Sequence, residues 1–269
     1  MPRRLPLTGA RVLITGAGSG IGRRMALGAA ERGAEVVIWD MNAAAATRVA
    51  DEITAAGGQA SATALDVTDA TAVAAEAVAA GPVDVLINNA GVVTGKRLLE
   101  ASEAQIRRTF EVNTLALYWS TRAFLPGMLE RGRGKVVTIA SAAALVGVAK
   151  QTDYAASKWA AFGFTESLRA ELRKDAAPVS TLIVAPYYID TGMFAGVQTR
   201  FPVLLPILQE RDVARKVLDA IESGRQQLIM PPFSALTPAL RMLPVVAMDA
   251  LADALGINST MDEFTGRTP

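Results

Sequence analysis

The sequence predicts a single α/β domain built on a doubly wound parallel sheet. The chain has 269 residues, of which 51% are hydrophobic, enough for one large domain with a substantial core. Short apolar runs alternate with segments of helical periodicity along most of the chain. Most of these runs are continuously apolar, which is typical of parallel strands buried on both faces of a sheet.

Seven of the apolar runs, most of them rich in β-branched residues, are expected to be the strands. In chain order they are residues 12–15, 36–39, 62–65, 85–87, 136–139, 181–184 and 228–230. The segments between them are alanine-rich or amphipathic, and we expect them to be helices that pack on the sheet. These helices are residues 25–32, 43–56, 71–79, 103–130 and 154–174.

The regular alternation ends after about Asp190. Residues 201–208 are apolar but contain two prolines, and a similar region runs from Pro231 through Pro244 to Leu255. Proline inside a helix removes a hydrogen bond and clashes with the preceding turn, so continuous helices are not expected in these regions. We therefore expect one domain over residues 1–269, with a substrate lid at 190–225 and a C-terminal extension at 231–269.

The composition excludes several classes of chemistry. The absence of cysteine and histidine excludes disulfides, cysteine nucleophiles, the usual zinc sites and a histidine general base. Acid–base chemistry near neutral pH is left to carboxylate, lysine or tyrosine side chains, and no metal is expected. The net charge of +1 does not indicate nucleic acid or an anionic membrane as a partner.

No segment of the sequence predicts export or membrane insertion. The first strand-like run begins at about Arg11, and no signal-peptide apolar stretch fits before it. No window reaches the roughly 18 to 20 apolar residues of a membrane span. The expected location is therefore the cytoplasm.

A glycine-rich loop joins the first expected strand to the first expected helix. It runs from Thr15 to Gly22 and has glycine at every second position from Gly16 onward. Glycine permits a tight turn and a close approach of the backbone to a pyrophosphate, and the N-terminus of the following helix supplies N–H donors. In this strand–loop–helix context, the loop predicts nucleotide binding.

Asp40 ends the second expected strand, roughly 20 residues after the loop. An acidic residue there accepts hydrogen bonds from an adenosine ribose and repels a 2′-phosphate, which favours NAD over NADP. The alternative is an ordinary polar strand end. Arg23 and Arg24 argue against a firm preference because they place positive charge close to the loop.

Tyr154 and Lys158 are four residues apart in an expected helix, so their side chains share one face about a turn apart. A phenol is a poor acid at neutral pH, but an adjacent ammonium group favours the phenolate. The pair can then exchange a proton with an alcohol or carbonyl oxygen. Taken alone, the same spacing also occurs by chance, with a packed tyrosine and a solvated lysine.

Together with other motifs, these features resemble the short-chain dehydrogenase/reductase family over residues 11–230. The resemblance rests on the glycine loop, residues 66–67, 88–91 and 186–191, Asn113, Ser141 and the Tyr154/Lys158 pair, all in the family's order. It implies a Rossmann-type sheet of about seven parallel strands in the order 3-2-1-4-5-6-7, with helices on both faces and an irregular C-terminal lid. It also implies a homodimer or homotetramer packed through residues 103–130 and 154–174.

The resemblance implies roles for individual residues. Tyr154 would be the acid/base, Lys158 would favour its phenolate and hold the nicotinamide ribose, and Ser141 would hydrogen-bond the substrate oxygen. Asn113 would anchor a water that links Lys158 to solvent. The implied cofactor-binding residues are Gly16, Ser19, Gly20, Ile21, Gly22, Asp40, Asp66, Val67, Asn89, Ala90, Gly91, Tyr154, Lys158, Pro186, Ile189 and Thr191.

Some of these residues also have simpler structural interpretations. Ser141 could cap a helix or turn, Asn113 could be a buried amide satisfied by backbone, and Asp66 could be a turn residue rather than a contact of the adenine amino group. The joint spacing of the motifs favours the functional interpretation. Tyr187 departs from the family, which commonly has glycine after this proline, and we expect it to narrow the pocket near the nicotinamide.

Several segments resemble, more narrowly, the retinol and 17β-hydroxysteroid dehydrogenases, whose substrates are large apolar alcohols and carbonyls. The segments are residues 37–42, 88–93, 123–128 and 186–195. The region after Asp190 supplies apolar side chains that would cover such a substrate, or would instead pack on the domain or on another subunit. They are Met193, Phe194, Phe201, Leu204, Leu205 and Ile207.

The expected function is NAD(H)-dependent interconversion of a bulky apolar alcohol with its ketone or aldehyde. One alternative is a 3-oxoacyl thioester reductase, although no basic patch for a phosphopantetheine or carrier protein is visible. Another is a catalytically silent NAD-binding regulatory protein, which need not retain the complete catalytic set. Residues 231–255 could touch a membrane surface, although Asp249 and Asp253 oppose adhesion to anionic lipid, or they could form a dimer contact.

Overall fold

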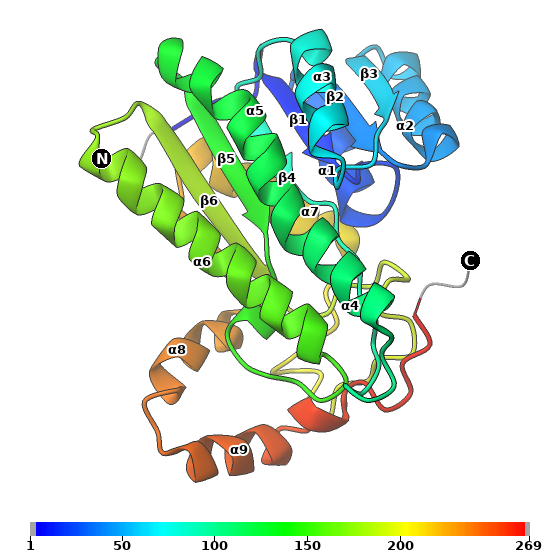
Figure 1. Cartoon of the computed structure of the whole chain (residues 1–269), viewed down its shortest axis with the longest axis vertical. Helices are drawn as coiled ribbons and strands as arrows, with labels where there is room; N and C mark the ends of the chain where they lie inside the picture. Colours follow the sequence, from blue (N-terminus) through cyan, green and yellow to red (C-terminus); the bar gives the residue numbers. More distant parts are fainter. Residues whose placement is uncertain (1–3, 267–269) are drawn as a thin grey trace.

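The fold is a parallel sheet with helices on both faces (Figure 1). A computed structural model describes residues 4–266. The strands are β1 (Arg11–Thr15), β2 (Glu35–Asp40), β3 (Gln59–Ala64), β4 (Val85–Asn88), β5 (Gly134–Ile139), β6 (Val179–Pro186) and β7 (Gln227–Met230). Each pairs in parallel with its neighbours in the order β3-β2-β1-β4-β5-β6-β7, which confirms the predicted fold class and strand order.

The main helices follow the strands as the sequence predicts. They are α1 (Gly20–Glu31), α2 (Ala43–Ala55), α3 (Ala70–Ala80), α4 (Glu103–Phe110), α5 (Ala116–Glu130), α6 (Thr152–Lys174) and α7 (Glu210–Ser223). Side-chain caps fix several starts: Asn42 accepts from the Ala45 N–H, and Ser102 and Gln105 form a reciprocal capping box before and within α4. These caps satisfy backbone donors that have no partner inside the helix.

The third strand begins earlier than expected. Residues 62–65 were predicted from their apolar character, whereas β3 spans Gln59–Ala64. It is an edge strand that pairs with β2 alone among the described strands, and none of its residues is buried. Polar residues such as Gln59 and Ser61 therefore fit this strand, and a search for apolar runs misses them.

The helix predicted over 103–130 is interrupted. Residues Glu111–Leu115 form a π-helical segment, η1, between α4 and α5. Such a segment inserts one wide turn into a helix and changes the direction in which its side chains point. Asn113 lies within this turn and is buried, so the interruption occurs at a predicted site residue.

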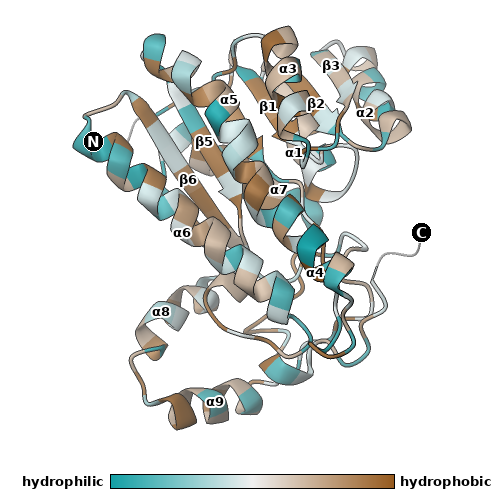
Figure 2. Ribbon diagram, viewed as in Figure 1, coloured by the Kyte–Doolittle hydropathy of each residue, from teal (hydrophilic) through white to brown (hydrophobic). Residues whose placement is uncertain are grey.

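Two apolar cores fill the space between the sheet and its two helical layers. Alternate residues of the central strands point to opposite faces: Val12 and Ile14 of β1 belong to one core, and Leu13 belongs to the other. Helices α1, α2 and α7 cover the first core, and α3, α5 and α6 cover the second. Figure 2 shows apolar residues along the strands and a mixture of apolar and polar residues on the helices.

The predicted lid range, 190–225, includes a helix that belongs to the main body. Helix α7 packs beside α1 and contributes Val213, Val217 and Ile221 to the first core. Residues 190–209 before it are irregular, apart from a bridge between Ile189 and Leu208. We therefore restrict the proposed lid to residues 190–209.

The C-terminal part is more regular than the prolines suggested. After β7 come η3 (Pro232–Leu236), α8 (Thr237–Leu240), α9 (Val245–Ala254) and η4 (Ile257–Ser259). Pro238 lies in the first turn of α8 and Pro244 directly precedes α9, positions at which proline starts a helix without interrupting it. Across residues 4–266, no helix has the length and apolar character needed to cross a bilayer.

Lys135 on β5 is fully buried in the sheet. Its ammonium group donates to the Arg225 carbonyl at 3.4 Å, and the ion pairs among the described residues do not include it. Burial lowers the pKa of Lys135 from its usual 10.5 to about 8. The charged lysine therefore costs stability below about pH 8, and this cost fades as the pH rises towards 10.5.

We expect Lys135→Met to raise the free energy of unfolding by about 1–3 kcal/mol at neutral pH, because it removes an unpaired buried charge. The gain should shrink as the pH rises above about 8, where the folded wild-type protein releases the proton more readily than the unfolded chain. Urea unfolding at neutral and alkaline pH measures both effects, with the exposed Lys216→Met as control. A destabilised variant, or an equal gain at both pH values, contradicts the prediction.

Candidate active site

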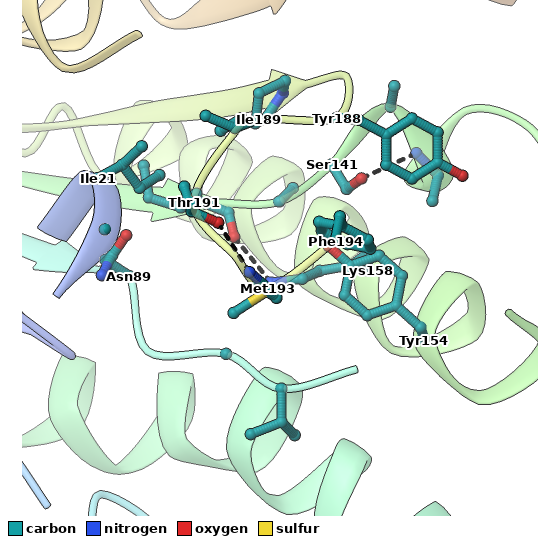
Figure 3. Close-up of a pocket in the computed structure, with 18 of the residues that line it drawn as sticks. Ile21, Asn89, Ser141, Tyr154, Lys158, Tyr188, Ile189, Thr191, Met193 and Phe194 are labelled. Carbon is teal, nitrogen blue, oxygen red and sulfur yellow. Dashed lines mark hydrogen bonds between the residues drawn. The ribbon is translucent and has the colours of Figure 1, made fainter. Parts of the chain in front are cut away.

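A cavity of about 580 Å³ opens at the carboxyl ends of the strands. Residues from the ends of β1, β2, β4, β5 and β6 line it, because parallel strands all end at one edge of the sheet. The structure brings every predicted site residue except Asn113 to its wall. Figure 3 shows how Tyr154 and Lys158 from α6 face the loop that contains Ile189, Thr191 and Phe194.

The glycine loop at one end of the cavity leaves no room for a side chain at Gly16 or Gly22. A Cβ atom on Gly22 would overlap the Gly16 carbonyl oxygen and lie 2.6 Å from Asn89 Nδ2. Gly16 has a φ of +65°, and a Cβ on it would lie 2.9 Å from the Ala90 Cα. The loop and the start of α1 thus form a bare backbone cradle of the kind that fits a dinucleotide pyrophosphate.

Asn89 holds this loop against the end of β4. Its Nδ2 donates to the carbonyl oxygens of Thr15 (2.9 Å) and Gly16 (3.1 Å). Its backbone N–H and that of Ala90 both donate to the Thr15 hydroxyl, at 3.0 and 3.1 Å. Asn89 therefore positions the cradle in addition to lining the cavity.

The Asp40 carboxylate is fixed at the end of β2 by two backbone donors. Gly18 N–H lies 2.8 Å from Oδ2, and Asn42 N–H lies 2.9 Å from Oδ1. These bonds tie the glycine loop to the second strand and leave the carboxylate at the cavity wall.

Asp66 has the contacts of a turn residue and also lies in the cavity wall. It accepts bonds from the backbone and hydroxyl of Thr68, as in a turn, and it also lines the cavity beside Arg108, whose Nη1 is 3.2 Å from Oδ2. Burial alone would raise the pKa of Asp66, but the bonds from Thr68 and Arg108 outweigh this and lower the pKa. Asp66 is therefore a carboxylate acceptor near neutral pH.

Tyr154 and Lys158 lie on one face of α6, and both are buried. Lys158 Nζ donates to the Ile139 carbonyl at 3.0 Å and lies 5.7 Å from the centre of the Tyr154 ring. Burial lowers the pKa of Lys158 to about 8. Burial also raises the pKa of Tyr154, and a hydrogen bond with Ser141 offsets only part of this rise.

The folded protein thus favours the neutral phenol of Tyr154. The neighbouring ammonium group was expected to favour the phenolate, but desolvation, which favours the neutral form, has the largest influence on the pKa of Tyr154. A neutral phenol can donate a proton, and the Tyr154 side chain lines the cavity.

Ser141 and Asn113 also match their simpler structural interpretations. Ser141 precedes η2 (Ala142–Ala144), and its Oγ accepts a hydrogen bond from the Ala143 N–H at 3.1 Å. The Ser141 side chain also forms a hydrogen bond with Tyr154. The Asn113 amide pairs with both backbone groups of Val92 (2.9 Å each) and with Ser157 Oγ (3.0 Å). The water-anchoring role of Asn113 stays a prediction.

A cluster of aromatic rings packs against the Tyr154 ring. The Phe194 ring lies edge-on to Tyr154, with centroids 5.6 Å apart, and Tyr188 lies 5.1 Å from Phe194. The Tyr188 hydroxyl forms hydrogen bonds with Gln151 Nε2 (3.0 Å) and with Thr260 Oγ1 (2.8 Å). Tyr188 therefore links the start of α6 to the C-terminal part of the chain.

Two groups of cavity residues escaped the sequence reasoning. At the nucleotide end they are Arg48, Arg108 and Val112, which carry no motif. At the other end they are Phe233, Ser234, Thr237, Leu240, Met248, Leu251, Ala252, Leu255 and Ile257. The helical spacing of the residues from Met248 to Leu255 was a usable signal, but the surrounding prolines obscured it.

The cradle, the buried tyrosine–lysine pair and the shared cavity define a nucleotide-dependent oxidoreductase with a Rossmann-type fold. The model of the short chain dehydrogenase family matches residues 10–200, and the chain belongs to this family. It is therefore a short-chain NAD(P)-dependent alcohol dehydrogenase/carbonyl reductase.

Known proteins support the assignment over most of the chain. It is 41% identical to epidermal retinol dehydrogenase 2 of Mus musculus, covering 98% of this chain and 88% of the relative. It is 37% identical to estradiol 17-beta-dehydrogenase 11 of Pongo abelii, covering 90% and 82%. A short-chain dehydrogenase/reductase from Burkholderia phymatum in complex with NAD has a similar structure, with a TM-score of 0.81, 30% identity and coverage of 88% and 94%. These relatives confirm the resemblance to the retinol and 17β-hydroxysteroid subgroup.

Proposed function

We propose that this protein is an NAD(H)-dependent oxidoreductase that interconverts a bulky apolar alcohol and its ketone or aldehyde. The observation that carries the proposal is that one cavity joins the glycine cradle, Tyr154 and a wall of apolar side chains from the C-terminal part. The names of the relatives, a retinol and an estradiol dehydrogenase, support a retinoid-, steroid- or lipid-like substrate.

The residues around Tyr154 would divide the work of the reaction. Ser141 would hold the substrate oxygen, and Tyr154 would give it a proton during reduction or take one during oxidation. Lys158 would hold the cofactor beside this oxygen, and Phe194 and Tyr188 would keep water away from it. When bound, the nicotinamide supplies or accepts the hydride.

A preference for NAD over NADP is part of the proposal. A 2′-phosphate bound at the end of β2 would meet the fixed Asp40 carboxylate. The two arginines that argued for NADP are already engaged, since Arg23 pairs with Glu52 and Arg24 pairs with Glu210 (3.3 Å). Two other arginines, Arg48 and Arg108, line this end of the cavity, and Arg108 pairs with Asp66 (3.2 Å).

We also propose a homo-oligomer formed through one face of α5 and α6. Leu115, which directly precedes α5, and Tyr118 and Leu129 on α5 lie on one side at helical spacing, and each is at least 39% exposed. Trp159 on α6 is also exposed. Burying such a face against its copy would remove apolar surface from water, as in most dimers of stable subunits.

Tyr154→Phe should lower turnover of the true substrate by about 10²- to 10⁴-fold, because it removes the proton donor and keeps the ring. NADH affinity should stay within several-fold of wild type. A panel of retinoids, steroids, secondary alcohols and acyl thioesters, followed by NADH absorbance in both directions, identifies the substrate for this test. Tyr118→Phe, which removes an exposed hydroxyl outside the cavity, is the matched control. Near-normal turnover by Tyr154→Phe would remove Tyr154 from the chemistry.

Asp40→Ala should improve kcat/KM with NADP relative to NAD by on the order of tenfold, since it removes the repulsion of a 2′-phosphate. Steady-state rates with both cofactors measure the ratio. Glu35→Ala, at the opposite end of the same strand, should leave the ratio unchanged. An unchanged ratio in Asp40→Ala excludes Asp40 from cofactor selection.

Tyr118→Arg should shift the protein from oligomer to monomer, because it places a charge in the proposed apolar contact. Sedimentation equilibrium across a concentration series measures the shift. Leu99→Arg, at a residue 97% exposed on a different part of the chain, is the control and should not change the mass. A wild-type protein that is monomeric throughout, or a Tyr118→Arg variant that stays oligomeric, contradicts the proposed contact.

A further inference from the structure

Helix α9 lies at the end of the molecule, well away from the sheet (Figure 1). Within α9, all of which the structure describes, Ala252 is the one buried residue. Most of this short helix is therefore not covered by other protein, although much of it is apolar.

The two sides of α9 have different surroundings. Met248, Leu251, Ala252 and Leu255, spaced as one helical face, line the same cavity as Tyr154. Val245 and Val246 lie away from that face and are 75% and 80% exposed. We call the first set the inner face of α9.

Polar contacts tie the chain down on both sides of α9. Before the helix, the Arg241 guanidinium lies 4.2 Å from the centre of the Trp159 ring and donates to the Leu145 carbonyl at 3.2 Å. After it, the Thr260 hydroxyl is bonded to Tyr188, and Lys150 Nζ donates to the Met261 carbonyl at 3.1 Å. The helix is thus held at its ends, and its inner face is left facing the cavity.

The inner face does not touch the acid/base itself. The residues packed around Tyr154 are Ala143, Ala155, Val93 and Phe194, which come from other parts of the chain. An alcohol small enough to occupy only the space beside Tyr154 has no need of α9. A larger apolar substrate extends along the cavity and reaches it.

From this arrangement we infer that the inner face of α9, with Leu251 at its middle, forms the far wall of the substrate pocket and selects for long apolar substrates. The inference rests on the proposed function and assigns the substrate's apolar body to one element. Leu251 is in this view a specificity-determining residue, and it takes no part in the proton transfer. Each methylene that is buried against this wall should raise affinity about fourfold.

The test uses Leu251→Asp, which places a charge on the inner face, and alcohols from butan-2-ol to dodecan-2-ol. In wild type, kcat/KM should rise with chain length. In Leu251→Asp it should fall by at least about tenfold for dodecan-2-ol and stay within about twofold for butan-2-ol. Val246→Asp, on the exposed side of the same helix, is the matched control and should change neither value.

A second readout separates this inference from the proposed function. Displacement of the uncharged dye Nile red by the same alcohols measures binding without turnover, and NADH binding with thermal unfolding reports whether each variant is folded. Wild type that binds longer alcohols more tightly but oxidises none would overturn the proposed function and keep the inference. Affinity independent of chain length, or equal losses for both alcohols in a folded Leu251→Asp, would overturn the inference. If Leu251→Asp does not fold, Leu251→Ala is read by the same criteria.

Discussion

The close contact between the glycine loop and the end of β4 is the constraint on which the rest of the site depends. Gly16 and Ala90 approach so closely that no Cβ fits on Gly16, and Asn89 bonds the carbonyl oxygens of the loop. The same loop is tied to β2 through Asp40. One turn therefore holds the ends of β1, β2 and β4 together at the nucleotide end of the cavity.

Beyond this cradle, the protein places its two proton-active groups out of water. Lys158 and Tyr154 are both buried. Burial lowers the pKa of Lys158 and raises the pKa of Tyr154, and both shifts favour the uncharged side chain. The chain contains no histidine, so the proposed chemistry would rely on groups that titrate far from neutrality when exposed. The pKa of Lys158 is lowered to about 8, and the raised pKa of Tyr154 favours the neutral phenol that the proposed proton donor requires.

The sequence predicts the architecture well because each strand buried on both faces leaves a continuous apolar run. The cavity residues with motifs, such as Asp40, Ser141 and Tyr154, are also visible, since their spacing follows the strand ends. By contrast, the edge strand β3 has little apolar character, and the π turn at Asn113 depends on packing that no local pattern encodes. Prolines that begin α8 and α9 were interpreted as interruptions, so the far wall of the cavity was missed.

The link between Tyr188 and Thr260 has a consequence for how the protein is made. The glycine loop packs against the end of β4, whereas the residues at the other end of the cavity follow β7 in the chain. The Tyr188 hydroxyl has both of its hydrogen-bond partners, Gln151 and Thr260, only after Thr260 has been synthesised and has packed against it. During synthesis, the glycine loop and β4 are therefore made well before the residues that line the other end of the cavity.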